Sequence, residues 1–142
     1  MFKFKDYRGK YYSKDSCKFL LQYHLIFVCK YRKKLLQGSL NDDIISKMLE
    51  ISNKYDFEIR TLQSDVDHIH FLISSTPQIS ISQIVRVLKQ ESTIFIWKKY
   101  RAFLSKHFWK EHTFWSDGYF VSTIGDVSQE TLRKYIEEQG KD

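Results

Sequence analysis

Apolar side chains recur along this chain with two different periods, and the changes between them divide it into strands and helices. Residues 17–29 are almost continuously apolar or aromatic, which predicts one long strand at the centre of a sheet. Residues 57–64 alternate between apolar and polar side chains, and a short turn leads to a strand over 68–75, so the two predict an antiparallel hairpin. A last strand is expected over 119–124, and residues 1–15 are interpreted as an N-terminal arm or a short hairpin.

Helical spacing occurs between these strands and again near the C-terminus. One helix is expected from about 39 to 55, a longer one from about 80 to 100, and a final one over 126–140. Each follows a residue whose side-chain oxygen can accept a backbone hydrogen bond: Ser39 or Asn41, Ser80 or Ser82, and Ser128. The order β-α-β-β-α-β with an appended helix predicts an α+β, ferredoxin-like (RRM-like) fold, an antiparallel sheet with two helices on one face.

The composition is that of one folded domain over residues 1–142. Of the 142 residues, 42% are hydrophobic and 16% aromatic, which excludes a disordered chain. No apolar run approaches the roughly 18 residues that cross a bilayer, and the N-terminus lacks the apolar core of a signal peptide. Cys17 and Cys29 would lie far apart on one strand, so we expect no disulfide and a reducing, cytoplasmic location. The net charge of +6 fits a nucleic-acid partner and does not prove one.

Two histidines flank one apolar residue in His68-Ile69-His70. Successive side chains of a strand point to opposite faces, so the two imidazoles share a face, separated by roughly 7 Å of strand rise, and can converge on one ion. Asp65 and Asp67 can add oxygen ligands or orient the rings. By itself the pattern is weak, because two partly exposed strand histidines arise often by chance.

A tyrosine and a glutamine, Tyr135 and Gln139, are four residues apart on the expected final helix and therefore share a face, one turn apart. A metal site, a tyrosine nucleophile and an amide oxygen are together suited to cutting a phosphodiester. The chain has nine tyrosines, but only Tyr135 has both the glutamine partner and a glycine, Gly125, where the chain can bend just upstream.

With these motifs the sequence resembles the HUH-type single-tyrosine transposases of small bacterial and archaeal insertion sequences (the IS200/IS605 type). The likeness rests on the His-hydrophobic-His motif at 68–70 and on Tyr135 with Gln139. It extends over nearly the whole chain and includes three further segments: residues 23–33, the Asp-x-Asp at 65–67, and residues 120–125.

The resemblance implies a DNA strand transferase that acts on single-stranded DNA with hairpins near the ends of a mobile element. Tyr135 would be the nucleophile and would form a 5′-phosphotyrosine link. A divalent ion, Mg²⁺ or Mn²⁺, would be held by His68, His70 and Gln139, with Asp65 as a further ligand. The family also implies a homodimer in which the tyrosine helix can act on its own subunit or on the neighbour.

Basic residues in two segments are interpreted as DNA contacts. One segment follows the first long strand and places cations around an aromatic ring, which suits a phosphate backbone and its bases. The other lies on the second helix, where a solvated surface is the alternative. The residues are Lys30, Arg32, Lys33, Lys34, Arg86 and Lys89.

Two alternatives stay open at this stage. A domesticated or replication-initiator-like nickase would use the same site. A non-catalytic RNA-binding module would share the sheet architecture but needs exposed aromatics on its central strands, and its Lys/Arg-Gly-Phe/Tyr signature is absent. Among the other histidines, His24 is expected to be a hydrogen-bonded core residue, and His107 and His112 are weak metal candidates. Residues 101–118 are expected to pack aromatic rings over a sheet edge, with stacking on bases second.

Overall fold

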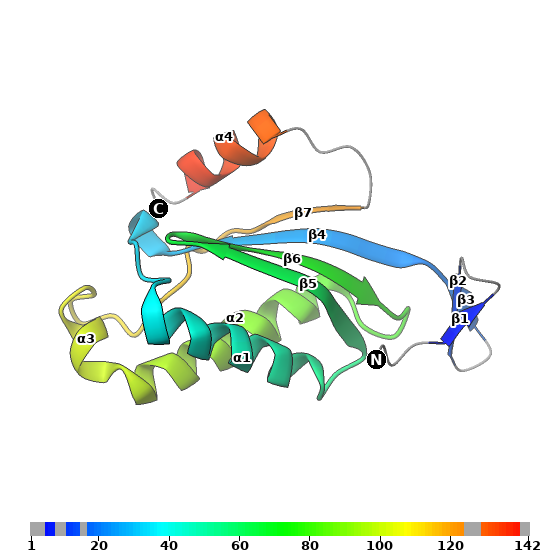
Figure 1. Ribbon diagram of the computed structural model, residues 1–142, viewed down its shortest axis with the longest axis horizontal. Helices are drawn as coiled ribbons and strands as arrows, with labels where there is room; N and C mark the ends of the chain where they lie inside the picture. Colours follow the sequence, from blue (N-terminus) through cyan, green and yellow to red (C-terminus); the bar gives the residue numbers. More distant parts are fainter. Residues whose placement is uncertain (1–4, 8–10, 15–16, 124–128, 140–142) are drawn as a thin grey trace.

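The computed structural model describes all of the chain except residues 1–4, 8–10, 15–16, 124–128 and 140–142. Its main sheet has the strand order β5-β6-β4-β7, each strand antiparallel to its neighbours. The strands are β4 (Leu21–Val28), β5 (Phe57–Asp65), β6 (His68–Ser75) and β7 (Phe120–Thr123). Helices α1 (Gly38–Ser52) and α2 (Ile81–Lys99) cover one face, and α4 (Gln129–Gln139) lies over the other (Figure 1). The predicted α+β, ferredoxin-like order is confirmed.

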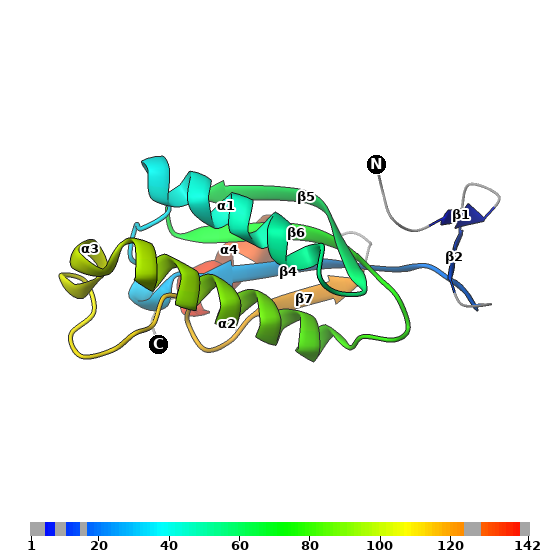
Figure 2. The same cartoon turned by 90° about the horizontal axis from the view of Figure 1, so that it is seen from below.

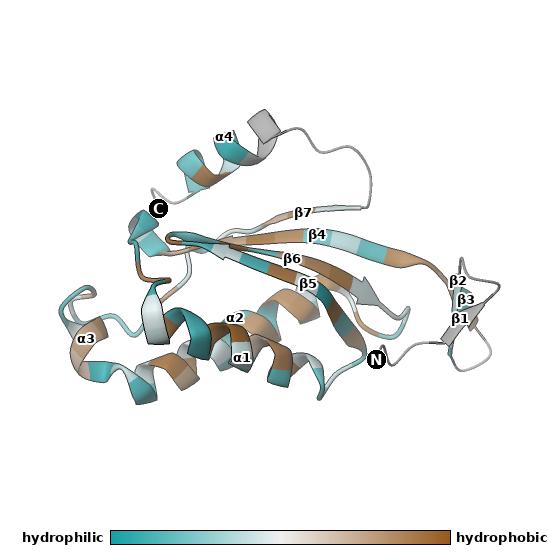
Figure 3. Cartoon of the chain, viewed as in Figure 1, coloured by the Kyte–Doolittle hydropathy of each residue, from teal (hydrophilic) through white to brown (hydrophobic). Residues whose placement is uncertain are grey.

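The hydrophobic core lies between the sheet and the helices α1 and α2. Figure 2 shows these two helices side by side across one face of the sheet. Leu25 and Phe27 on β4 and Ile69, Phe71 and Ile73 on β6 have no exposed surface. Fully buried residues of the helices pack against them: Ile44, Met48 and Ile51 from α1, and Ile84, Leu88 and Ile96 from α2. Figure 3 shows hydrophobic residues along these elements, whereas the described part of α4 is mainly hydrophilic. None of the described helices is both long and apolar enough to pass through a membrane.

The two core helices begin differently. Ser80 caps α2 as predicted: its hydroxyl accepts from the Gln83 backbone N–H, and the Gln83 side chain accepts from the Ser80 N–H. The prediction that Ser39 or Asn41 caps α1 is wrong, because α1 begins at Gly38, whose φ of +59° is a conformation that glycine adopts readily. It ends at Ser52, before the predicted end at 55.

The predicted long strand over 17–29 is two strands. The chain leaves one sheet and enters another at the 42%-exposed Leu20, and β3 (Cys17–Phe19) pairs with β2 (Tyr11–Lys14) instead. With β1 (Lys5–Tyr7) these form a separate small sheet beyond the end of β4 (Figure 1). The change of sheet at Leu20 cannot be read from the sequence, because the residues on both sides of it are apolar and form one continuous run. Cys17 and Cys29 are free thiols, as expected.

The sequence predicts that the aromatic stretch before β7 packs over a sheet edge; in the structure it packs mainly on α2, and Trp115 also contacts Phe27 of β4, with ring centroids 5.6 Å apart. The stretch opens with the short helix α3 (Arg101–Ser105). Trp115 is 4% exposed, and its indole N–H donates to the hydroxyl of Ser92 on α2. His112 stacks on Trp97, with ring centroids 4.3 Å apart, and His107 packs on Phe103. Both weak metal candidates are therefore in aromatic packing.

Candidate active site

A pocket of about 690 Å³ lies between the second face of the sheet and α4. His68 and His70 line it from β6, so the two imidazoles share one face, as the strand pattern predicts. Asp65 lies opposite His68 in the strand register, and α4 contributes Arg133 and Glu137 to the lining. The pocket thus combines imidazoles, carboxylates and a guanidinium group.

His68 is oriented by a carboxylate. Its Nδ1 lies 2.9 Å from Asp67 Oδ1, and the other oxygen of Asp67 lies 3.6 Å from Arg32 Nε. A neutral His68 that donates from Nδ1 keeps the lone pair of Nε2, which is the form in which imidazoles bind metal ions. Arg32 also lines the pocket, so one chain of contacts links a cation to the orientation of a candidate ligand.

His70 has a histidine partner. Its Nε2 lies 3.1 Å from Nδ1 of His24, on the neighbouring strand β4. Burial, followed by the proximity of His24 and His68, lowers the pKa of His70 and favours the neutral ring. His24 is hydrogen-bonded, as expected, but it is not a core residue: it alternates with the buried Leu25 and is half-buried on the α4 face of the sheet.

The donors of this pocket fit a divalent ion. His68 and His70 offer ring nitrogens, and Asp65 and Glu137 offer carboxylate oxygens along the same lining. Within the described ranges, no three His, Cys, Asp or Glu side chains are grouped closely enough to hold an ion by themselves. An amide oxygen, water or a substrate oxygen would have to complete the coordination, which is the open arrangement that metal catalysis requires.

The α4 helix carries Tyr135 and Gln139 on one face, as predicted, but these two residues contact Phe120 and Gly118 and do not line the pocket of the histidines. The Tyr135 ring packs on Phe120 with centroids 5.5 Å apart, and its phenol oxygen is buried. The Gln139 amide lies directly over Gly118, where a Cβ would come within 2.5 Å of it. Within one chain the expected assembly of Tyr135, Gln139 and the histidines is therefore absent from the described pocket, and other residues of α4 line it.

The basic segment after β4 adopts an unusual backbone conformation. Tyr31 and Arg32, within the short 3-10 turn η1 (Lys30–Arg32), both have positive φ, 59° and 52°. Such angles in non-glycine residues cost energy and often mark functional sites. Lys30 contacts Asp117, while Arg32 and Lys34 are exposed. This part of the predicted DNA surface borders the pocket through Arg32.

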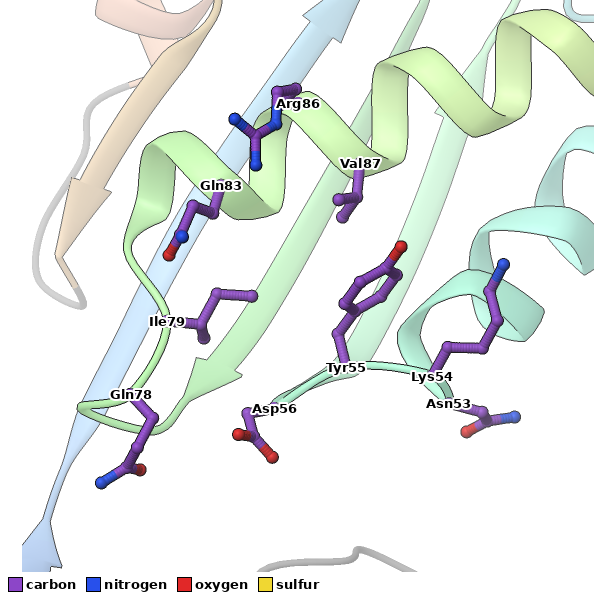
Figure 4. A pocket seen from close by; sticks show the side chains of 9 residues that line it. All are labelled: Asn53, Lys54, Tyr55, Asp56, Gln78, Ile79, Gln83, Arg86 and Val87. Atoms are coloured by element: carbon purple, nitrogen blue, oxygen red, sulfur yellow. The ribbon is translucent and has the colours of Figure 1, made fainter.

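Arg86 and Lys89, the two DNA contacts predicted on α2, lie in the helix layer on the opposite side of the sheet from the histidine pocket. Arg86 is exposed beside a cavity between the end of α1 and the start of α2, which contains no histidine (Figure 4). The Lys89 ammonium donates to the backbone carbonyls of Ser116, Asp117 and Gly118, at 2.7, 3.2 and 2.7 Å. This geometry gives Lys89 a structural role in the turn before β7.

Sequence reasoning missed four features of this region. His24 could have been found from its alternation with core residues, once the pairing of β4 with β6 is known. Gly118 could not, because its close contact with Gln139 depends on where α4 packs. The same holds for Arg133 and Glu137, which lie in the pocket only because α4 covers it with that face.

Comparison with known proteins identifies the class. The family model described as "Transposase IS200 like" matches residues 17–139, and the chain belongs to this transposase family. The ISDra2 transposase TnpA of Deinococcus radiodurans is 32% identical over 119 residues, 84% of each chain. The transposase for insertion sequence element IS200 of Salmonella typhimurium is 27% identical over 139 residues, 94% of this chain and 84% of the relative.

Solved structures agree on the fold. A crystal structure from Deinococcus radiodurans R1, described as that of a transposase, superposes with a TM-score of 0.81 at 27% identity, covering 89% of this chain and 96% of the other. A REP-associated tyrosine transposase bound to a REP hairpin gives a TM-score of 0.53 at 11% identity, over 89% and 70% of the two chains. At that identity the second likeness bears on the fold alone.

Proposed function

We propose that this chain cleaves and rejoins single-stranded DNA at the hairpin-bearing ends of an insertion sequence, through a covalent link to Tyr135. The observation that carries the proposal is the pocket itself: His68 and His70 lie beneath the helix that bears Tyr135, in a chain of a transposase family. An active site made of an imidazole pair and a nearby tyrosine suits transfer of a phosphoryl group.

In the proposed step the Tyr135 oxygen attacks the phosphorus of the scissile phosphodiester. Phenols in general have a pKa of about 10, and the Tyr135 phenol loses its proton as the new oxygen–phosphorus bond forms. The bond from phosphorus to the 3′ oxygen breaks, and that oxygen takes up a proton and leaves as a 3′-hydroxyl. Attack by a 3′-hydroxyl of another strand reverses the step, and because the number of phosphoester bonds is conserved, rejoining needs no ATP.

A divalent ion would be held by His68 and His70, with the Gln139 amide oxygen and Asp65 as further ligands. Mixed nitrogen and oxygen donors with vacant positions suit Mg²⁺ or Mn²⁺. When bound, such an ion polarises a non-bridging oxygen of the scissile phosphate. Asp67 would support this role by orienting the His68 ring through its contact with Nδ1.

Since Tyr135 packs on Phe120 within one chain, cleavage would use a second position of α4. That position would lie on the same subunit or across a homodimer. Mixing two inactive variants separates these cases. A heterodimer of Tyr135→Phe and His68→Ala subunits contains one intact composite site if the helix acts on its neighbour, so the mixture should recover cleavage. If the helix acts on its own subunit, the mixture stays inactive.

The chemistry is tested by incubating the protein with single-stranded oligonucleotides of its flanking DNA and Mg²⁺, and looking for a protein–DNA adduct that survives SDS. Tyr135→Phe should bind the DNA but form no adduct, because it loses only the attacking oxygen. His68→Ala and His70→Ala should fold and bind DNA but not cleave it. An adduct mapped by mass spectrometry to another tyrosine, or cleavage at the wild-type rate by either histidine variant, would contradict the proposal.

A further inference from the structure

One tryptophan differs from the other two. Trp97 and Trp115 are each 4% exposed and pack on the core, whereas Trp109, in the loop that follows α3, is 81% exposed. Other large apolar side chains of the described chain are exposed to about half at most, Ile94 at 52% being the next. An indole exposed to this degree contributes little to folding and is available to a partner.

The backbone of this loop holds the indole outward beside a cation. Lys110 has a φ of +56°, in the left-handed region that a lysine seldom adopts. Its ammonium lies 4.7 Å from the centre of the Trp109 ring. The contact is within the range of a cation–π interaction, so the pair presents an exposed aromatic ring with a positive charge over one of its two faces.

The loop is joined to the active-site pocket by the basic segment after β4. The hydroxyl of Tyr31 donates to Glu111, 3.1 Å away, and its ring lies 6.4 Å from that of Phe108. The next residue, Arg32, lines the pocket with the histidines. The contacts of Tyr31 therefore place the loop with Trp109 next to the basic segment that borders the pocket, and the two segments together form the surface considered below.

This surface carries the charge and rings that single-stranded nucleic acid requires. Tyr31 is a second exposed ring, at 47%. Lys110 lies over the Trp109 ring and Lys33 over the Phe108 ring, and Lys34 and Lys106 of the same two segments are exposed. Glu111 and Asp117 are acids that pair with Tyr31 and Lys30 there. Phosphates bind cations, and unpaired bases stack on exposed rings with little regard to sequence.

We propose that Trp109 stacks on an unpaired base of the DNA strand that lies across Arg32 and Tyr31 into the active-site pocket. The inference rests on the proposed function for its substrate, single-stranded DNA. It adds a base-binding position outside the cleavage site. The surface selects single strands, because the bases of a duplex already stack on one another and cannot reach the indole.

Fluorescence tests this directly, since the other two tryptophans are buried. Addition of a single-stranded dT20 oligonucleotide should quench the emission of the wild-type protein, and the quenching should be lost in Trp109→Phe. Trp109→Ala should bind dT20 about 5-fold to 150-fold more weakly, the range that removal of one stacked ring produces, while Trp109→Phe keeps most of the affinity. The dependence of log affinity on log salt should not change, because the indole makes no phosphate contact.

Tyr11→Ala is the matched control. Tyr11 is also an exposed ring, at 42%, but it belongs to β2 in the small sheet at the opposite end of the molecule from α3 (Figure 1). The Tyr11→Ala variant should bind dT20 with the affinity of the wild type. Binding of Trp109→Ala within twofold of the wild type, an equal loss in the control, or a change in oligomeric state without a loss of DNA binding would each overturn the inference. Quenching by dT20, together with no Tyr135 adduct on oligonucleotides of the flanking DNA with Mg²⁺, would refute the cleavage chemistry and leave the stacking position standing.

Discussion

Replacing Lys89 with methionine should destabilise the fold more than it weakens DNA binding. The ammonium of Lys89 donates to three backbone carbonyls of the turn at 116–118. Hydrogen bonds to charged groups contribute about 1.5–3 kcal/mol each when buried, but this turn is partly open to water, so we expect a total loss of about 2–3 kcal/mol. Methionine keeps the apolar stem, so the change isolates the ammonium.

Urea denaturation and thermal unfolding measure this loss. For a chain of this size 1 kcal/mol lowers Tm by roughly 3 °C, so the variant should melt about 6–9 °C below the wild type. Lys98→Met is the control, because Lys98 is an exposed lysine on the same helix and its replacement should change stability by less than about 0.5 kcal/mol. A Lys89→Met protein of unchanged stability, with weaker DNA binding and a shallower salt dependence, would refute the structural role and restore Lys89 as a DNA contact.

Three further outcomes are expected. Alanine at residues 32–34 should weaken binding of single-stranded DNA and reduce its log–log salt slope by up to about 2, at roughly 0.7 per phosphate contact; an unchanged slope would make these residues a merely solvated surface. Partial burial tends to raise the pKa of Glu91, but hydrogen bonds from Lys54 and Tyr55 outweigh it and hold the pKa below 4.5. The ionised Glu91 carboxylate therefore stabilises the folded protein above about pH 4.5, and this stabilisation is lost as the pH falls through the lowered pKa. Glu91→Gln should make the free energy of unfolding depend less on pH below about pH 5, and Glu50→Gln is an exposed control. Burial raises the pKa of the Cys29 thiol, so Ellman's reagent should label this residue only after denaturation.

The order of elements could be predicted because each carries its own signal. The hairpin of β5 and β6 follows from alternation and a short turn, and the start of α2 follows from Ser80 and the glutamine three residues later. The start of α1 could not be predicted in the same way. Ser39 and Asn41 are good capping residues, but the chain enters the helix at Gly38, where a positive φ sets its direction. At that position the path of the chain in the folded protein, and not the capping preference of the nearby residues, determines where the helix begins.

The histidine pair was accessible from the sequence for a physical reason: residues two apart on a strand share a face whatever the sheet order. The partners of the pair were not. Contact between His24 and His70 depends on which strand β6 pairs with on its far side, and that pairing joins residues 46 positions apart. The position of α4 depends on a connection that lies among the residues the structure does not describe, so the residues of α4 that face the pocket could not be assigned from helical spacing alone.

The helix α4 has two distinct faces, and their separation constrains how a cleaving site can form. At 100° per residue, the face with Tyr135 and Gln139 is roughly 130° around the helix from the face with Arg133, Ile136 and Glu137. Sliding α4 along its axis therefore cannot bring the tyrosine over the histidines. The helix must rotate by more than a third of a turn, or the α4 of a second copy must enter the pocket in another orientation. Either route breaks the contacts of Tyr135 with Phe120 and of Gln139 with Gly118. In the packing seen here Tyr135 lies against Phe120 and is not among the residues that line the histidine pocket, so the proposed cleavage requires α4 to leave this position.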